Sequence, residues 1–222
     1  MRKCCSDVSM EISGAKDATA TMQLIISNII LGFFPALALL TGVDAQAVRS
    51  MGFIGCSMAE NVAQGYMAVG GTRMWGPYGT GGAVVQSWTD TDSASWQSFD
   101  RQAAQNGKPS AVWVQICIFS QNGATYDEVK KLIANARQHA APGAEIFITG
   151  QPLYDAGQTC FLAGQGGPEL TDSLAKRASE DASLNATYGG TFRLHNGEVA
   201  DGCHANTAGQ QSLGGQAIGF WG

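Results

Sequence analysis

The chain has 222 residues, a formal net charge of −5 and only 14% charged residues. Its lysines and arginines are few and scattered, which argues against a nucleic-acid partner. Six cysteines without a Cys-x-x-Cys pair, and three histidines without a cluster, argue against a zinc site.

The N-terminal part of the chain has the pattern of a secretory leader. Residues 22–40 are almost entirely apolar, basic residues precede them, and small residues at Ala45 and Ala47 are typical of a cleavage site. We therefore predict a leader over residues 1–47 and a single secreted domain over residues 48–222. The alternative is an uncleaved membrane anchor, because the apolar run approaches the ~20 residues that span a bilayer. After cleavage we expect a monomer with no stable membrane association.

Beyond the leader, short apolar runs alternate with amphipathic stretches. Strands are predicted over residues 50–54, 111–119, 145–150 and 188–194. Helices are predicted over residues 58–69, 93–106, 125–141, 169–184 and 207–220, with Ser93 or Ser95 and Thr125 as N-caps. This alternation predicts an α/β fold, a three-layer α/β/α sandwich around a mostly parallel central sheet.

The stretch from Gly70 to Trp96 is rich in both glycine and aromatic residues. Glycines let a backbone approach a ligand closely, and aromatic rings offer flat contact surfaces. Trp75, Tyr78 and Trp88 are therefore candidates for substrate binding. The alternative is that these rings cover the core beneath a long loop.

Polar residues of possible catalytic use follow three of the four predicted strands, and the weakest candidate is Gln151, after residues 145–150. Ser57 comes after the first strand, and Asn122 follows the strand that contains residues 111–119. Ligands of open α/β sheets bind at the carboxyl ends of strands, so both residues are expected on one rim. Taken singly, each has an ordinary structural interpretation, Ser57 as a helix cap and Asn122 as part of an Asn-Gly turn.

Asp201 and His204 lie three residues apart in a glycine-containing turn near the end of the chain. A carboxylate there can orient one imidazole nitrogen and leave the other as a base, which could activate Ser57 as a nucleophile. The resulting oxyanion needs hydrogen-bond donors. We expect these from the Ser57 amide, a glycine amide of residues 79–82 and the Asn122 side chain.

Four cysteines remain after the leader, which suggests disulfides in a secreted chain. Cys160 and Cys203 lie in predicted loops near the presumed site, so this pair is favoured. Cys56 and Cys117 lie at or within buried strands, where the alternative is that each is a small apolar filler of the core.

Taken in order, these motifs resemble those of the SGNH (GDSL-type) hydrolases. The family's first block, Gly-Asp-Ser, corresponds to residues 55–57, where Cys56 replaces the aspartate and Ser57 matches the nucleophile. The fifth block, Asp-x-x-His, is intact at Asp201 and His204.

The two middle blocks match less completely. Gly82, or Gly81, corresponds to the oxyanion glycine of the second block. Asn122 matches the asparagine of the third block, but Ser120 and Gly123 replace its usual glycine and aspartate. The resemblance extends over the whole predicted domain, and its specificity lies in the order of the motifs.

The resemblance implies a flavodoxin-like sandwich and a Ser57-His204-Asp201 triad that hydrolyses carboxylic esters through an acyl-enzyme, without metal or cofactor. The family includes carbohydrate deacetylases, lipases and thioesterases. Export and a polar, glycine-rich surface favour short acetyl esters on polysaccharide, with a lipase or thioesterase as an alternative. Two other hypotheses remain: a non-catalytic carbohydrate-binding protein, and a cysteine-dependent enzyme that uses Cys56 or Cys203 beside His204.

Overall fold

A computed structural model describes residues 49–222 of the chain. The predicted leader, and the membrane anchor that is its alternative, lie outside these residues. Within the described part, every helix is too short or too polar to cross a lipid bilayer.

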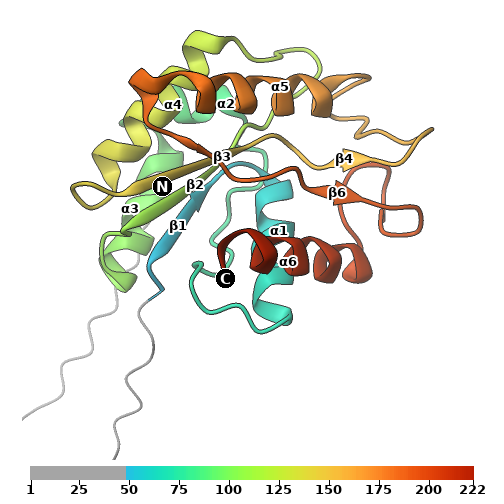
Figure 1. The fold of residues 1–222 in the computed structure, drawn as a ribbon, viewed down its shortest axis with the longest axis horizontal. Coiled ribbons are helices and arrows are strands. Elements are labelled where there is room, and N and C mark those ends of the chain that lie inside the picture. Colours follow the sequence, from blue (N-terminus) through green and yellow to red (C-terminus); the bar gives the residue numbers. More distant parts are fainter. Residues whose placement is uncertain (1–48) are drawn as a thin grey trace, which may run out of the picture. The chain divides into compact units, whose positions relative to one another are not determined.

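The core of the fold is a four-stranded parallel sheet with the strand order β1-β2-β3-β5 (Figure 1). The strands are β1 (Met51–Ile54), β2 (Ala111–Gln115), β3 (Glu145–Thr149) and β5 (Thr187–Tyr188). Met51 is paired with Ala111, which is in turn paired with Glu145. On the other side of β1, Met74 forms an isolated parallel bridge with Met51.

Helices cover both faces of this sheet (Figure 1). On one face lie α1 (Ser57–Ala68) and α6 (Thr207–Trp221). The opposite face carries α2 (Val85–Thr89), α3 (Ala94–Asn106), α4 (Tyr126–His139) and α5 (Gly167–Glu180). Every residue of β1 and β2 is buried, as expected for strands covered on both faces. The predicted α/β/α sandwich is confirmed.

Helix starts follow the local sequence. The Ser93 side chain accepts a hydrogen bond from the amide of Trp96 and caps α3. Thr125 and Glu128 form a complete capping box at the start of α4, in which each side chain accepts from the other residue's backbone N–H. Both predicted caps are confirmed.

Three predicted elements differ from the structure. The strand predicted over residues 111–119 ends at Gln115, and the strand predicted over residues 188–194 is divided between two sheets. Tyr188 pairs with Ile148 in the main sheet, whereas β6 (Arg193–Leu194) pairs with β4 (Leu153–Tyr154). The helix predicted over residues 169–184 becomes α5 and a separate 3₁₀ turn, Ala182–Leu184.

Helices α1 and α6 pack so closely that only glycine fits at their contact. A Cβ atom on Gly65 would lie 1.6 Å from the carbonyl oxygen of Gln210, and one on Gly214 would lie 2.2 Å from the carbonyl carbon of Gly65. The two backbones therefore touch. This contact fixes the helix that begins at Ser57 against the helix that follows His204.

Candidate active site

Ser57, His204 and Asp201 form one hydrogen-bonded row. The Ser57 Oγ atom lies 2.8 Å from Nε2 of His204, across 147 residues of sequence. On the other side of the ring, Nδ1 of His204 lies 2.7 Å from Oδ2 of Asp201. The structure thus brings together the three residues that the sequence singled out for catalysis.

Ser57 is the first residue of α1 and does not cap it. The cap position is Cys56, which makes no side-chain hydrogen bond to the helix. The Ser57 hydroxyl therefore faces His204 and is not used by the first turn of the helix. This geometry is what a serine nucleophile requires, because the base must reach its proton directly.

The Asp201 carboxylate is held by three hydrogen bonds from the turn it belongs to. Its Oδ1 atom accepts from the backbone N–H groups of Cys203 and His204, at 3.1 and 2.8 Å. The hydrogen bond from the His204 side chain is the largest cause that lowers the pKa of Asp201, and the His204 backbone amide is the next. The carboxylate therefore stays charged and can fix the orientation of the imidazole.

Asn61 connects this turn to the nucleophile's helix. Its Oδ1 atom accepts a hydrogen bond of 3.0 Å from the amide of Ala205, which follows the candidate base. Asn61 lies four residues after Ser57 and so one turn further along the same face of α1. That spacing was a usable sequence signal, and our prediction missed it.

Two disulfides flank the row, Cys56–Cys117 and Cys160–Cys203. The pairing favoured from sequence is the one the structure contains. Cys56 and Cys117 are not free apolar fillers, because the end of β1 and the segment after β2 lie close enough for them to be joined. A cysteine nucleophile at Cys56 or Cys203 is also contradicted, since both thiols are bonded.

The glycine-rich loop beside Ser57 is held by one carboxylate. Oε1 of Glu60 accepts from the backbone N–H groups of Gly79 and Thr80, at 2.9 and 2.7 Å, and from the Thr80 hydroxyl at 2.9 Å. The Thr80 hydroxyl also lies 3.2 Å from the carbonyl oxygen of Cys56, the residue before Ser57. The loop that carries Gly82 is thus tied to the start of α1.

The structure supports the predicted oxyanion donors to different degrees. Gly82 has φ = +77°, a left-handed backbone that favours glycine. Asn122 is exposed, and its amide closes a turn on Phe119 at 3.0 Å. Among residues 49–222, the hydrogen bonds include none between the Asn122 side chain and the Ser57-His204-Asp201 row. Its oxyanion role remains a prediction.

The aromatic substrate-binding prediction is wrong for the tryptophans. Trp75 and Trp88 are 0% and 1% exposed. The Trp75 indole N–H donates to the Arg49 carbonyl, and that of Trp88 to the Gly55 carbonyl. Their polar atoms are satisfied inside the core, so the alternative interpretation, rings that cover the core, holds for both.

Tyr78 is also directed inward. Its hydroxyl donates to the carbonyl of Phe53, and its ring lies 4.9 Å from the Phe53 ring, centroid to centroid. Burial raises the pKa of the Tyr78 hydroxyl well above its ordinary value, and the Glu60 carboxylate adds to the effect. The hydroxyl is therefore a neutral, structural donor, while the Tyr78 side chain is partly buried and its role in substrate binding remains a prediction.

A second carboxylate-histidine-hydroxyl row lies at helices α3 and α4, on the other face of the sheet. Asp100 lies 2.8 Å from Nδ1 of His139, whose Nε2 lies 2.9 Å from the Thr91 hydroxyl. However, the His139 ring is stacked on Trp96 with centroids 4.2 Å apart, and its side chain is only 12% exposed. This row packs helices α3 and α4 together, which distinguishes it from the half-open row at Ser57.

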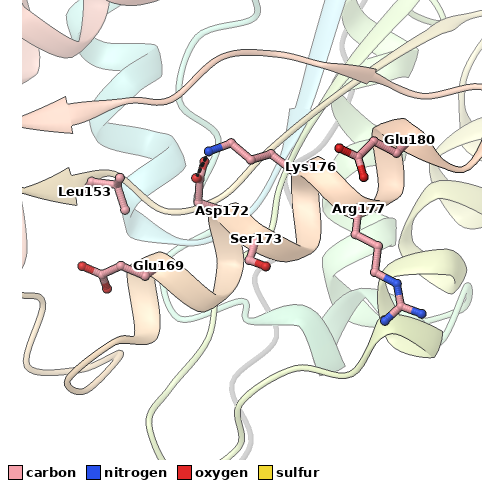
Figure 2. A pocket seen from close by; sticks show the side chains of 7 residues that line it. All are labelled: Leu153, Glu169, Asp172, Ser173, Lys176, Arg177 and Glu180. Carbon is pink, nitrogen blue, oxygen red and sulfur yellow. Dashed lines mark ion pairs between the residues drawn. The ribbon is translucent and has the colours of Figure 1, made fainter.

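A cavity of about 460 Å³ lies on the outer face of α5 (Figure 2). Figure 2 shows its charged side chains in sticks, with Lys176 paired to Asp172 at 2.7 Å. Its lining residues are Leu153, Glu169, Asp172, Ser173, Lys176, Arg177 and Glu180. None of the three residues of the candidate row lines it, so this cavity is separate from the candidate site.

Comparison with known proteins supports the fold but supplies no family assignment by sequence. No family model matches the chain, and no curated protein sequence does. Among solved structures, the chain is similar to one described as "a putative SGNH hydrolase from Slackia heliotrinireducens", with a TM-score of 0.52 and 19% sequence identity. The match covers 78% of this chain and 98% of the other. At this identity it shows a shared α/β fold.

Proposed function

We propose that the protein is an exported serine esterase of the SGNH type. The hydrogen-bonded row Ser57-His204-Asp201 carries the proposal, because its distances and order match what acyl transfer to a serine needs. The fold shared with a structure described as a putative SGNH hydrolase supports the proposal as well. Two disulfides support export, because they persist in oxidising compartments.

In the proposed reaction, Ser57 Oγ attacks the ester carbonyl carbon while its proton passes to Nε2 of His204. Asp201 stabilises the resulting imidazolium through Nδ1. The same proton then goes to the leaving alcohol as the tetrahedral intermediate collapses to an acyl-enzyme. Water, deprotonated by His204, attacks the acyl carbon; the bond from the acyl carbon to Ser57 Oγ then breaks, His204 returns the proton to Oγ, and the acid is released. The amides of Ser57 and Gly82 and the Asn122 side chain are the proposed oxyanion donors.

The proposed substrate is a short acyl ester, acetyl above all, on carbohydrate. The low charge and the glycine- and glutamine-rich polar composition of the chain support this choice over a long-chain lipid ester, since long acyl chains need a continuous apolar surface. A carbohydrate-binding protein without activity is the competing hypothesis. This hypothesis predicts that the substitution of Ser57 or His204 changes no rate of ester hydrolysis.

Hydrolysis of p-nitrophenyl acetate and butyrate tests the proposal. We expect Ser57→Ala and His204→Ala to lower kcat by at least about 10³-fold, as removal of a triad member does. His195→Ala is the matched control, because His195 is exposed and its hydrogen bonds go to Glu198 and Asp155, outside the row. A folded but inert wild-type protein, or a Ser57→Ala variant of undiminished rate, would contradict the proposal.

A further inference from the structure

Phe161 has the highest exposed fraction, 60%, among the large apolar side chains of residues 49–222. An aromatic ring in water forgoes a large part of the free energy that burial would provide. Of the aromatic residues considered for substrate binding, Trp75 and Trp88 are buried in the core and Tyr78 is partly buried against it. Among the described residues, Phe161 is therefore the aromatic side chain with the largest exposed fraction.

The position of Phe161 links it to the candidate site. Its amide donates to the carbonyl of Gly202 at 3.2 Å, and a Cβ atom on Gly202 would lie 3.5 Å from its ring. Gly202 stands between Asp201 and His204 in the chain. On the other side, the next residue, Leu162, accepts a hydrogen bond of 2.8 Å from the amide of Ser120. Phe161 thus lies between the turn of the candidate base and the segment that leads to Asn122.

The backbone around Phe161 is held in place before any ligand binds. The preceding residue, Cys160, is bonded to Cys203, the neighbour of His204. The carbonyl of Cys160 also accepts from the amides of Ala163 and Gly164, at 3.1 and 3.0 Å. A ring held this way can bind a ligand at a low cost in conformational entropy.

The surroundings of Phe161 determine which ligand suits it. The loop that carries Phe161 lines a cavity of about 440 Å³, although Phe161 itself is not a lining residue. Six of the nine lining residues have polar side chains: Tyr154, Asp155, Gln158, Thr159, Gln165 and Glu169, with Ala156, Gly157 and Gly166 between them. An acyl chain would need several adjoining apolar side chains, and the single aliphatic side chain that lines this cavity is that of Ala156. A sugar ring needs one flat apolar surface for its C–H groups and several hydrogen-bonding partners for its hydroxyls.

We propose that Phe161 and the Asp155–Glu169 cavity form a binding subsite for a sugar ring of a polysaccharide. The inference rests on the proposed esterase function and specifies its substrate: the ester is carried by a glycan chain, and this subsite holds the chain beside His204. Phe161 contributes affinity for the polymer and takes no part in the chemical step. A small ester that does not reach the subsite gains nothing from it.

Two substrates separate these roles. For Phe161→Ala we expect kcat/KM on acetylated xylan or acetylated glucomannan to fall about tenfold, mainly through KM, as loss of an aromatic contact does. The value for p-nitrophenyl acetate should change less than twofold. Phe161→Tyr should retain polymer activity. Phe220→Ala is the control, because Phe220 is 41% exposed and lies on α6.

The outcomes distinguish this proposal from the esterase proposal. An unchanged polymer activity, or an equal loss on both substrates, overturns the subsite while the esterase stands. If the wild type hydrolyses neither substrate, the esterase fails, and affinity electrophoresis in the same two polymers then decides the subsite. If the polymers retard the migration of the wild type but not that of Phe161→Ala, the subsite is supported. If they do not retard the wild type, the subsite is overturned.

Discussion

Asp201 illustrates how much can depend on one exposed side chain. It orients His204 through Nδ1 and accepts two backbone hydrogen bonds from the same turn. Asn in its place would keep an oxygen for the backbone but turn a donor, or a weaker acceptor, toward the imidazole. We expect Asp201→Asn to lower kcat for p-nitrophenyl acetate by about 10³–10⁴-fold with the fold intact. A loss of less than tenfold would show that Asp201 is not part of the catalytic row.

The same carboxylate predicts a pH dependence of stability. Its hydrogen bond from the His204 side chain lowers its pKa in the folded protein. A carboxyl with a lowered folded pKa stabilises above its unfolded pKa, about 3.9, and loses that contribution as the pH falls through the folded value. The difference in unfolding free energy between wild type and Asp201→Asn should therefore be larger at pH 6 than at pH 2.5, measured with urea. An equal or greater difference at pH 2.5 would refute this account.

Single residues also show what sequence could predict. Ser57, Asp201 and His204 could be predicted as candidate site residues, because their order and spacing in the sequence indicate a chemical role without a structure. Trp75 and Trp88 were not, since a glycine-rich aromatic stretch has the same composition whether it lines a cleft or covers a core. Glu60 and Phe161 gave no signal either. Their importance comes from backbone groups of residues 79–80 and 202, which only folding brings near.

At the scale of elements, the contact between α1 and α6 is the most constrained feature. Gly214→Ala would place a methyl group against the α1 backbone, so we expect a loss of about 1–3 kcal/mol in the free energy of unfolding. Gly215→Ala is the matched control, because a Cβ there would meet nothing within 4 Å. It should stabilise α6 by about 0.5–1 kcal/mol. Equal effects of the two substitutions would contradict the close packing.

The loop of residues 78–80 gives a second prediction at this scale. Glu60→Ala removes the acceptor of the Gly79 and Thr80 amides, and we expect a loss of about 1–3 kcal/mol in unfolding free energy. Because this loop leads to Gly82, kcat for p-nitrophenyl acetate should fall as well. Glu60→Gln keeps a carbonyl acceptor and should lie between wild type and Glu60→Ala in both measurements. A Glu60→Gln variant worse than Glu60→Ala would argue against this role.

Over the whole molecule, the disulfides join parts of the chain that no single element connects. Cys160–Cys203 closes a loop over 43 residues, so Cys160→Ser combined with Cys203→Ser should cost about 4 kcal/mol of unfolding free energy. Dithiothreitol should shift the urea midpoint of the wild type in the same direction. Since Cys203 precedes His204, esterase activity should fall with it. An unchanged midpoint after removal of both thiols would show that packing alone holds this turn.

The alternation of strands and helices was enough to predict the sandwich, because a parallel sheet needs a crossover after each strand. The division of residues 188–194 between two sheets was not predictable. Gly189 and Gly190 separate the two strands, and the partner of each is decided by distant residues, Ile148 and Leu153. The local sequence pattern thus predicted the three layers, whereas long-range strand pairing determined which sheet each part of residues 188–194 joins.

The hydrogen bond between Ser57 and His204 spans 147 residues, and this has a consequence for synthesis. Every strand of both sheets lies before His204 in the chain, as does every helix except α6. A nascent chain can therefore assemble its sheet while its nucleophile still has no base. The proposed hydrolytic activity is expected to arise only once His204 has been synthesised and α6 has docked on α1. A chain whose synthesis stops before His204 should hydrolyse no ester.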